Sequence, residues 1–175
     1  PGDSAETSVA WKMALENQST PTALILSRQN ITDLPAASGN RYQEALGEEK
    51  GGYIVMQNAN PEVILVANGS EVSLLCEVAA QLEAGQIPCR VVSVPSIGLF
   101  MEQPVEYRNS VITPGAKVFG LTAGLPSTLR GLVGAGGEVF GLDHFGASAP
   151  YKVLDEKFGF TVQNITETVL KFIGK

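Results

Sequence analysis

From residue 51 onward, apolar residues follow two patterns that alternate along the chain. Short continuous runs, such as the one in 62–67, are typical of strands covered on both faces. Such runs predict strands at 53–56, 62–67, 89–94, 116–121 and 138–142. Between them, apolar residues recur every third or fourth position, as in a helix with one buried face. The alternation predicts an α/β fold, a three-layer sandwich with a mainly parallel sheet of about five strands and helices on both faces.

Helices are predicted between the strands and near both ends of the chain, and several of their limits carry residues typical of helix ends. The predicted ranges are 4–16, 71–84, 97–110, 126–133, 151–158 and 162–173. Ser70 and Thr161 are in position to cap two of these helices with their side chains. Gly85 is expected to stop one helix, and Pro104 is expected to interrupt the one over 97–110.

The first 30 residues carry one predicted helix and one predicted strand. Asp3 and Glu6 have the spacing of a capping box, in which each side chain bonds to backbone near the other residue. The apolar run within 22–27 predicts a short buried strand. The polar stretch over 29–50 is long for a connection inside a compact domain. We therefore expect three parts, which are the end of a preceding domain (1–30), a linker (31–50) and a separate domain (51–175).

Composition and charge narrow the class of protein. With 175 residues, 44% of them apolar, the chain has the size and composition of a globular domain that needs no disulfide. A formal net charge of −6 argues against nucleic acid and anionic membrane surfaces as partners. No segment is long and apolar enough to span a membrane and no signal peptide is recognised, so we expect a cytoplasmic protein. Cys76 and Cys89 are expected to be buried, reduced thiols, and no zinc-binding pattern is present.

Two candidate sites favour structural roles when their neighbours are considered. The turn Asn68-Gly69-Ser70 opens a predicted helix, where an anion could bind. It lacks the glycines of a phosphate-binding loop, and Glu71 adds a negative charge at that point. His144, the one histidine of the chain, has no cysteine near it in sequence and no identifiable triad partner. We expect it to be a structural or surface residue of its loop.

Among the other charged candidates, Arg28 has the position that favours a function. Asp155 and Glu156 are adjacent on a predicted helix and therefore do not share a face. Arg130 lies in a glycine-rich run that is expected to form turns. Arg28, by contrast, directly follows the predicted strand 22–27, and open α/β folds bind ligands beyond the carboxyl ends of their strands. Its planar guanidinium suits bidentate binding of phosphate, and a salt bridge at a domain edge is the alternative.

Five segments, taken in chain order, carry a family resemblance. The segments ETSVAWKMALE and TPTALILSRQN are similar to the last helix and strand of the pyrimidine-binding domain of transketolases. The segment VILVANGSEVSLLCEVAAQL resembles the first strand, turn and helix of the C-terminal domain in that family. The segments CRVVSVPS and HFGASAPYKVLDEKFGFT resemble the following strand and the closing part of the same domain. The resemblance therefore implies a transketolase C-terminal domain for residues 51–175.

This resemblance implies a transferase of the pentose phosphate pathway that moves a two-carbon ketol unit between sugar phosphates. It uses thiamine diphosphate and a divalent metal (Mg²⁺ or Ca²⁺). In the family, the cofactor site and the catalytic histidines lie upstream, so this chain is expected to bind neither group and to be inactive alone. The implied partners are the upstream domains of the same protein, a sugar phosphate and a second subunit in a homodimer. Arg28 matches the family's arginine that holds the sugar phosphate, whereas Thr122 departs from the acidic residue of many bacterial members.

Two alternative functions fit parts of the sequence. Deoxyxylulose-phosphate synthase and the beta subunit of 2-oxo acid dehydrogenases share the domain layout implied by the resemblance. The segments SRQN and FGASAP favour transketolase over both. A stand-alone module that binds a small ligand at the turn 68–70, or serves in regulation, is the other alternative. The helix and strand predicted over 1–30 argue against such a module, because they have no domain of their own to complete.

Overall fold

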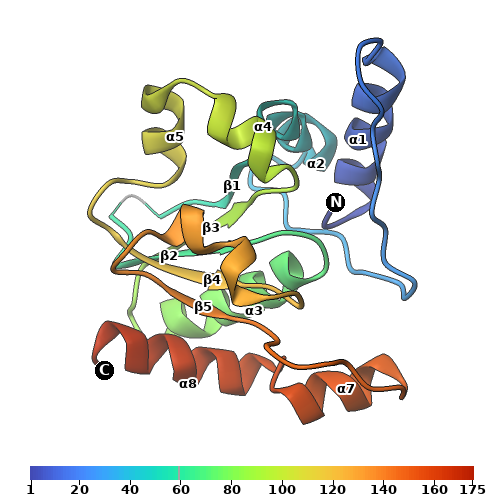
Figure 1. The fold of residues 1–175 in the computed structure, drawn as a ribbon. Coiled ribbons are helices and arrows are strands. Elements are labelled where there is room, and N and C mark those ends of the chain that lie inside the picture. Colours follow the sequence, from blue (N-terminus) through green and yellow to red (C-terminus); the bar gives the residue numbers. More distant parts are fainter. Residues whose placement is uncertain (59) are drawn as a thin grey trace.

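The computed structural model describes residues 1–58 and 60–175, and its centre is a five-stranded sheet (Figure 1). The strands are β1 (Tyr53–Met56), β2 (Val63–Ala67), β3 (Cys89–Ser93), β4 (Lys117–Leu121) and β5 (Glu138–Phe140). They lie in the order β1-β3-β2-β4-β5. The pairs formed by β2, β3, β4 and β5 are parallel, and β1 runs antiparallel to β3. The prediction of a mainly parallel sheet of about five strands is confirmed.

Helices cover both faces of this sheet, so that it forms the middle of three layers (Figure 1). The helices are α1 (Ser4–Glu16), α2 (Arg41–Ala45), α3 (Glu71–Ala84), α4 (Ile97–Glu102), α5 (Val105–Val111), α6 (Arg130–Val133), α7 (Tyr151–Phe158) and α8 (Val162–Ile173). Two 3₁₀ turns, η1 (Leu46–Lys50) and η2 (Pro126–Thr128), complete the elements. Helices α3 and α8 pack together on one face, and α4 and α6 cover the other. Because helices cover both faces of the sheet, the sequences of the strands are continuous apolar runs.

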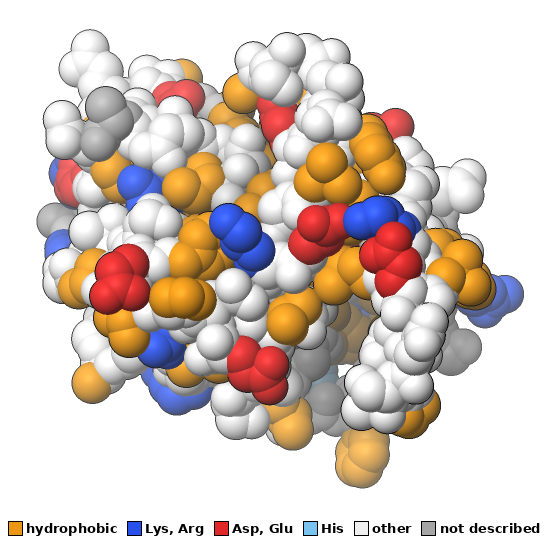
Figure 2. Space-filling view, turned by 90° about the horizontal axis from the view of Figure 1, so that it is seen from above, with side chains coloured by type: hydrophobic (Ala, Val, Ile, Leu, Met, Phe, Trp, Pro, Cys, Tyr) orange, Lys and Arg blue, Asp and Glu red, His pale blue; other side chains and the backbone are white. Residues whose placement is uncertain are grey.

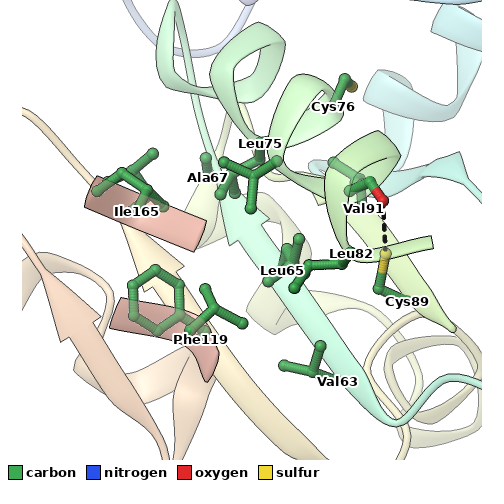
Figure 3. Packing of buried hydrophobic residues seen from close by; sticks show 14 of the residues in the cluster. Val63, Leu65, Ala67, Leu75, Cys76, Leu82, Cys89, Val91, Phe119 and Ile165 are labelled. Carbon is green, nitrogen blue, oxygen red and sulfur yellow. Dashed lines mark hydrogen bonds between the residues drawn. The ribbon is translucent and has the colours of Figure 1, made fainter. Parts of the chain in front are cut away.

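The central strand β2 shows how each face obtains its core. Its side chains alternate, so that Val63, Leu65 and Ala67 pack in one cluster and Ile64 and Val66 pack in the other. Figure 3 shows the first cluster, in which Leu65 lies near Leu82 of α3, with Phe119 of β4 close by. All five residues of β2 are fully buried. Burying a large aliphatic side chain contributes about 1.5–3 kcal/mol, so this strand is a main source of stability.

Most of the predicted helix ends are confirmed, with one exception. Pro104 separates α4 from α5, and the Thr161 side chain accepts a hydrogen bond from the amide of Asn164. Helix α3 ends before Gly85, as predicted. Ser70, however, forms no side-chain cap on α3, and its hydroxyl donates to the Glu71 carboxylate at 2.7 Å instead. The backbone of Ser70 is already helical (φ −59°, ψ −26°) rather than extended as at a typical N-cap, so its side-chain oxygen does not accept from the first amides of the helix.

The predicted strand over 22–27 is wrong, because the structure places no strand there. Helix α1 and the segment after it stand to one side of the sheet (Figure 1). A strand needs a neighbouring strand for its backbone hydrogen bonds, and none of the described residues supplies one to this segment. Ile25 consequently leaves 83% of its surface exposed. The region predicted as an irregular linker is partly ordered, since it contains α2 and η1.

Candidate functional site

The two chain neighbours of Arg28 line two different cavities at the same end of the sheet. The first, here called the α1 cavity, has a volume of about 550 Å³ and is lined by α1, the segment 22–27, Glu48, the turn 68–71 and Pro95–Ser96. The second, here called the α7 cavity, has a volume of about 510 Å³ and is lined by residues 29–32, the turn 70–71, Ala123, Leu142 and α7. Ser27 lines one cavity and Gln29 lines the other, so Arg28 occupies the chain position between them.

This end of the sheet is the one at which open α/β folds bind ligands. The turn 68–71 follows β2, Pro95 follows β3, and Ala123 and Leu142 follow β4 and β5, so all four mark carboxyl ends of parallel strands. From β2, the chain passes through α3 to β3 on one side, while β4 lies on the other side. The chain connections therefore diverge next to β2. This place is a topological switch point of the sheet, and the crevice outside it is the usual ligand site of open α/β folds.

Arg28 itself is exposed. Its side chain forms no ion pair with a carboxylate among the described residues. The predicted position at the mouth of a strand is therefore only partly reproduced, because the segment before Arg28 is not a strand here. Arg28 is thus a cation without an ion-pair partner among the described residues, in a segment next to the carboxyl ends of the strands. The salt bridge that was the alternative does not form within the described part of the chain.

The segment that carries Arg28 is anchored by a buried polar network at its two ends. Asp3 accepts from the amides of Glu6 (2.8 Å) and Leu34 (3.1 Å), and from the Nε of Arg41 (2.5 Å). Glu6 accepts from the Tyr53 hydroxyl at 2.6 Å and from Arg41 at 3.4 Å, and Arg41 also bonds to Tyr53. Burial, with the adjacent Glu6 carboxylate, raises the pKa of the Tyr53 hydroxyl. The network ties α1, α2 and β1 together around these charges.

The capping box predicted from Asp3 and Glu6 is present in modified form. The Asp3 side chain accepts from the Glu6 amide as predicted, whereas the Glu6 side chain reaches the amide of Gly2 at 2.5 Å. Sequence reasoning missed that Arg41 and Tyr53 join the same pair of carboxylates. Nothing in the local sequence signals this, because the two partners belong to α2 and β1.

Glu48 is a buried acid that no motif singled out. Its side chain lines the α1 cavity, only 4% of its surface is exposed, and its Oε2 atom has no hydrogen-bond partner among the described residues. Burial, with the negative charge of Glu6 nearby, raises the pKa of this carboxyl to about 8. Glu48 therefore gains or loses a proton near neutral pH.

The α7 cavity brings together acids that are far apart in sequence. Glu71 begins α3, Asp155 lies on α7, and both line the cavity. Burial raises the pKa of each carboxyl, and for Glu71 the charge of Asp155 adds to that effect. Glu156 is exposed and does not line the cavity, so the prediction that Asp155 and Glu156 form no paired site is confirmed. The partner of Asp155 comes from another helix, which adjacency in sequence does not reveal.

The remaining candidates have local roles. His144 is exposed, its Nδ1 lies 2.8 Å from the carbonyl oxygen of Phe145, and its ring packs on Phe158. Arg130 donates to the carbonyl of Gly137 at 3.3 Å and so closes the glycine-rich turn, as predicted. Thr122 is buried, and its hydroxyl accepts from the amide of Gly124 at 3.1 Å.

The two cysteines are buried and free, as predicted. Burial raises the pKa of both thiols to about 12, so neither is a ready nucleophile at neutral pH. Across residues 1–58 and 60–175, no group of three histidine, cysteine, aspartate or glutamate side chains is placed to hold a metal ion. In the same ranges, no helix is both long and apolar enough to cross a membrane.

Comparisons with known proteins identify the family. A family model described as the transketolase-like TK C-terminal domain matches residues 51–161. Transketolase from Bacillus subtilis (strain 168) is 39% identical over 179 residues, which is 100% of this chain and 26% of that protein. Solved structures of transketolase from Leishmania mexicana (TM-score 0.88, 38% identity) and from Pichia stipitis in complex with sedoheptulose-7-phosphate (TM-score 0.84, 35% identity) each cover 99% of this chain. This chain corresponds to 24% of each of those chains, about a quarter. The chain therefore belongs to the transketolase family, and residues 51–161 match its C-terminal domain.

Proposed function

We propose that this chain is the C-terminal portion of an enzyme that transfers a two-carbon ketol unit between sugar phosphates, and that Arg28 holds the phosphate of the bound sugar. The observation that carries the proposal is the exposed side chain of Arg28, which forms no ion pair among the described residues and whose chain neighbours line two cavities at the carboxyl ends of the strands. A relative of similar fold forms a complex with a sugar phosphate, sedoheptulose-7-phosphate. A phosphate dianion is the ligand that the planar fork of arginine binds best.

A single arginine suits this role better than a broad basic surface. The chain carries a net charge of −6, and on the face in Figure 2 acidic and basic side chains are interspersed with apolar ones. Such a surface attracts anions only weakly over long distances. The preference for a phosphorylated over an unphosphorylated sugar must then come from a short-range contact. In this proposal, a charge-assisted hydrogen bond from Arg28 supplies that contact.

The described residues of this chain give no positive support for a site for thiamine diphosphate and its divalent metal. No three histidine, cysteine, aspartate or glutamate side chains among them are grouped to hold a metal ion. The α7 cavity also presents Glu71 and Asp155 where a diphosphate would need donors. In this proposal, other parts of the complete protein bind both groups, and this chain supplies the phosphate contact and structural support.

The proposed domain organisation is supported by the exposed apolar surface of the first 30 residues. Trp11 and Leu15 on α1 are 52% and 77% exposed, and Ile25 and Leu26 are also exposed. An apolar surface of this kind is usually covered by another part of a protein. In the complete enzyme, residues 1–30 would finish the pyrimidine-binding domain and lead through 31–50 into the C-terminal domain. The complete enzyme is proposed to be a cytoplasmic homodimer.

The test compares Arg28→Ala with the unmodified complete enzyme, using ribose 5-phosphate and unphosphorylated ribose as acceptors. Loss of a charge-assisted contact costs about 1.5–3 kcal/mol, so kcat/KM should fall roughly 10- to 150-fold for the phosphorylated acceptor only. Arg130→Ala, which removes another exposed arginine, is the matched control and should leave both values unchanged. An equal loss for the two acceptors would overturn the role of Arg28 and favour a structural one.

A further inference from the structure

The α7 cavity has the position and size of a small-molecule site, and Arg28 is not among its lining residues. It lies outside the carboxyl ends of β2, β4 and β5, next to the point where the chain connections part. Its volume of about 510 Å³ falls within the range of organic-ligand sites. Four separate parts of the chain line it, namely residues 29–32, the first turns of α3, Ala123 after β4, and the segment from Leu142 through α7 to Phe160.

The charge inside this cavity is negative and has no internal counterion. Glu71, Asp155 and, on an exposed position, Glu77 line it, and no lysine, arginine or histidine is among the described lining residues. None of the three acids forms a salt bridge within the described chain. The Glu71 carboxyl receives hydrogen bonds from Ser70 and from the amide of Ala123, which favour its ionised form against the opposing effect of burial on its pKa. A cation entering the cavity would find this charge only partly screened by water.

Aromatic rings form a second, independent feature that favours a cation. Tyr151, Phe158 and Phe160 line the same cavity, and Leu74 and Leu154 add aliphatic surface. The face of an aromatic ring attracts a cation through its quadrupole, and groups of aromatic rings bind ammonium ligands in this way. Phe158 also packs on His144, and Phe160 packs on Phe140. The apolar part of the lining would hold the body of such a ligand while the carboxylates hold its charge.

The charged partner is an organic cation rather than a metal ion. Although Glu71 and Asp155 share the cavity, they belong to no set of three metal-ligating side chains in the described residues. Divalent ions require such a set of oxygen ligands at short distance, whereas an ammonium group needs only one or two acceptors and tolerates aromatic neighbours. We propose that the α7 cavity is a second ligand site, which binds a small organic ammonium compound with a flat apolar body.

The test uses isothermal titration calorimetry on the complete enzyme, with 2-phenylethylamine as the probe. The neutral analogue 2-phenylethanol has nearly the same shape and lacks the charge. We expect saturable binding of the amine and at least tenfold weaker binding of the alcohol. Glu71→Gln and Asp155→Asn should each weaken amine binding roughly 10- to 100-fold and leave the alcohol unchanged.

The matched control is Glu156→Gln, which removes the neighbouring acid of α7 that does not line the cavity. It should bind the amine as the unmodified enzyme does. Circular dichroism melting curves check that each variant is folded, and Asp155→Asn gives a second, more exposed position if Glu71→Gln is unstable. The proposal is overturned if the amine shows no saturation up to about 10 mM, if amine and alcohol bind equally, or if Glu156→Gln weakens binding as much as Asp155→Asn. The acceptor test of Arg28 measures catalysis, whereas the test of the α7 cavity measures binding. Failure of one proposal therefore does not decide the other.

Discussion

In the sheet, β2 places five consecutive side chains among apolar neighbours, whereas α1 is joined to the rest of the molecule mainly around four polar side chains. Asp3, Glu6, Arg41 and Tyr53 form that junction, and the charged members are almost fully buried. Val9 and Ala45 are also buried there, but they lie outside both large apolar clusters. The sheet is therefore held in place by apolar burial, which is not directional. Helix α1 is held in place by hydrogen bonds, which are directional.

The difference matters for how each region responds to change. Apolar packing depends little on pH, and its loss is proportional to the volume removed. A buried ionic network loses most when one partner is removed, because the remaining charges are left without compensation. Substitutions in the two regions should therefore produce losses of stability that are confined to different amides in hydrogen exchange.

The largest effect is expected in the sheet, for Leu65→Ala. Leu65 is fully buried at the centre of β2, so the substitution removes apolar contact and leaves a cavity. The opening free energy of the β3 and β4 amides, measured by hydrogen exchange in the complete enzyme, should fall by about 3–4 kcal/mol. Leu125→Ala, at a position that is 58% exposed, is the control and should change it by less than about 0.5 kcal/mol. A small effect of Leu65→Ala would show that β2 is not central to stability.

A smaller and local effect is expected for Arg41→Met. Methionine keeps much of the side-chain length but leaves Asp3 and Glu6 without their cation. The amides of α1 should lose about 2–4 kcal/mol of protection, while the β2 and β3 amides keep theirs. Arg130→Met removes an exposed arginine and should leave α1 unchanged. If sheet and α1 amides lost protection equally, the two regions would be one cooperative unit.

The smallest effect is expected from pH, through Glu48. Its folded-state pKa of about 8 lies above its ordinary value of 4.5, so between these values the folded state holds a proton that the unfolded state has lost. Its stabilising contribution is complete below about pH 4.5 and disappears as the pH rises through 8. Protection of the α1 and η1 amides, corrected for intrinsic exchange, should fall as the pH rises from 5 to 8, by no more than about 1.4 kcal/mol per pH unit, which is the limit that one proton allows. Glu48→Gln should abolish this slope, and an unchanged slope in that variant would assign it to another group.

The apolar patterns predicted the sheet because each strand is covered on both faces and therefore shows a continuous run. The same rule failed for 22–27, where an equally apolar run has no strand beside it among the described residues. Ser70 failed as a cap because its backbone is helical rather than extended, which the residue type alone does not predict. Arg28 was identified from its position after an apolar run and from a family resemblance, and its role in phosphate binding stays a prediction.

Local spacing by itself determined the five strands, the main helices and the expectation that Cys76 and Cys89 are buried, because period and burial are properties of short segments. Only the tertiary structure decided that Asp155 shares a cavity with Glu71 rather than with Glu156, and that Arg41 and Tyr53 complete the network of Asp3 and Glu6. The pKa of Glu48 was decided in the same way. These contacts join residues that are distant in sequence, and electrostatic interactions depend on spatial distance and burial, which no local pattern records.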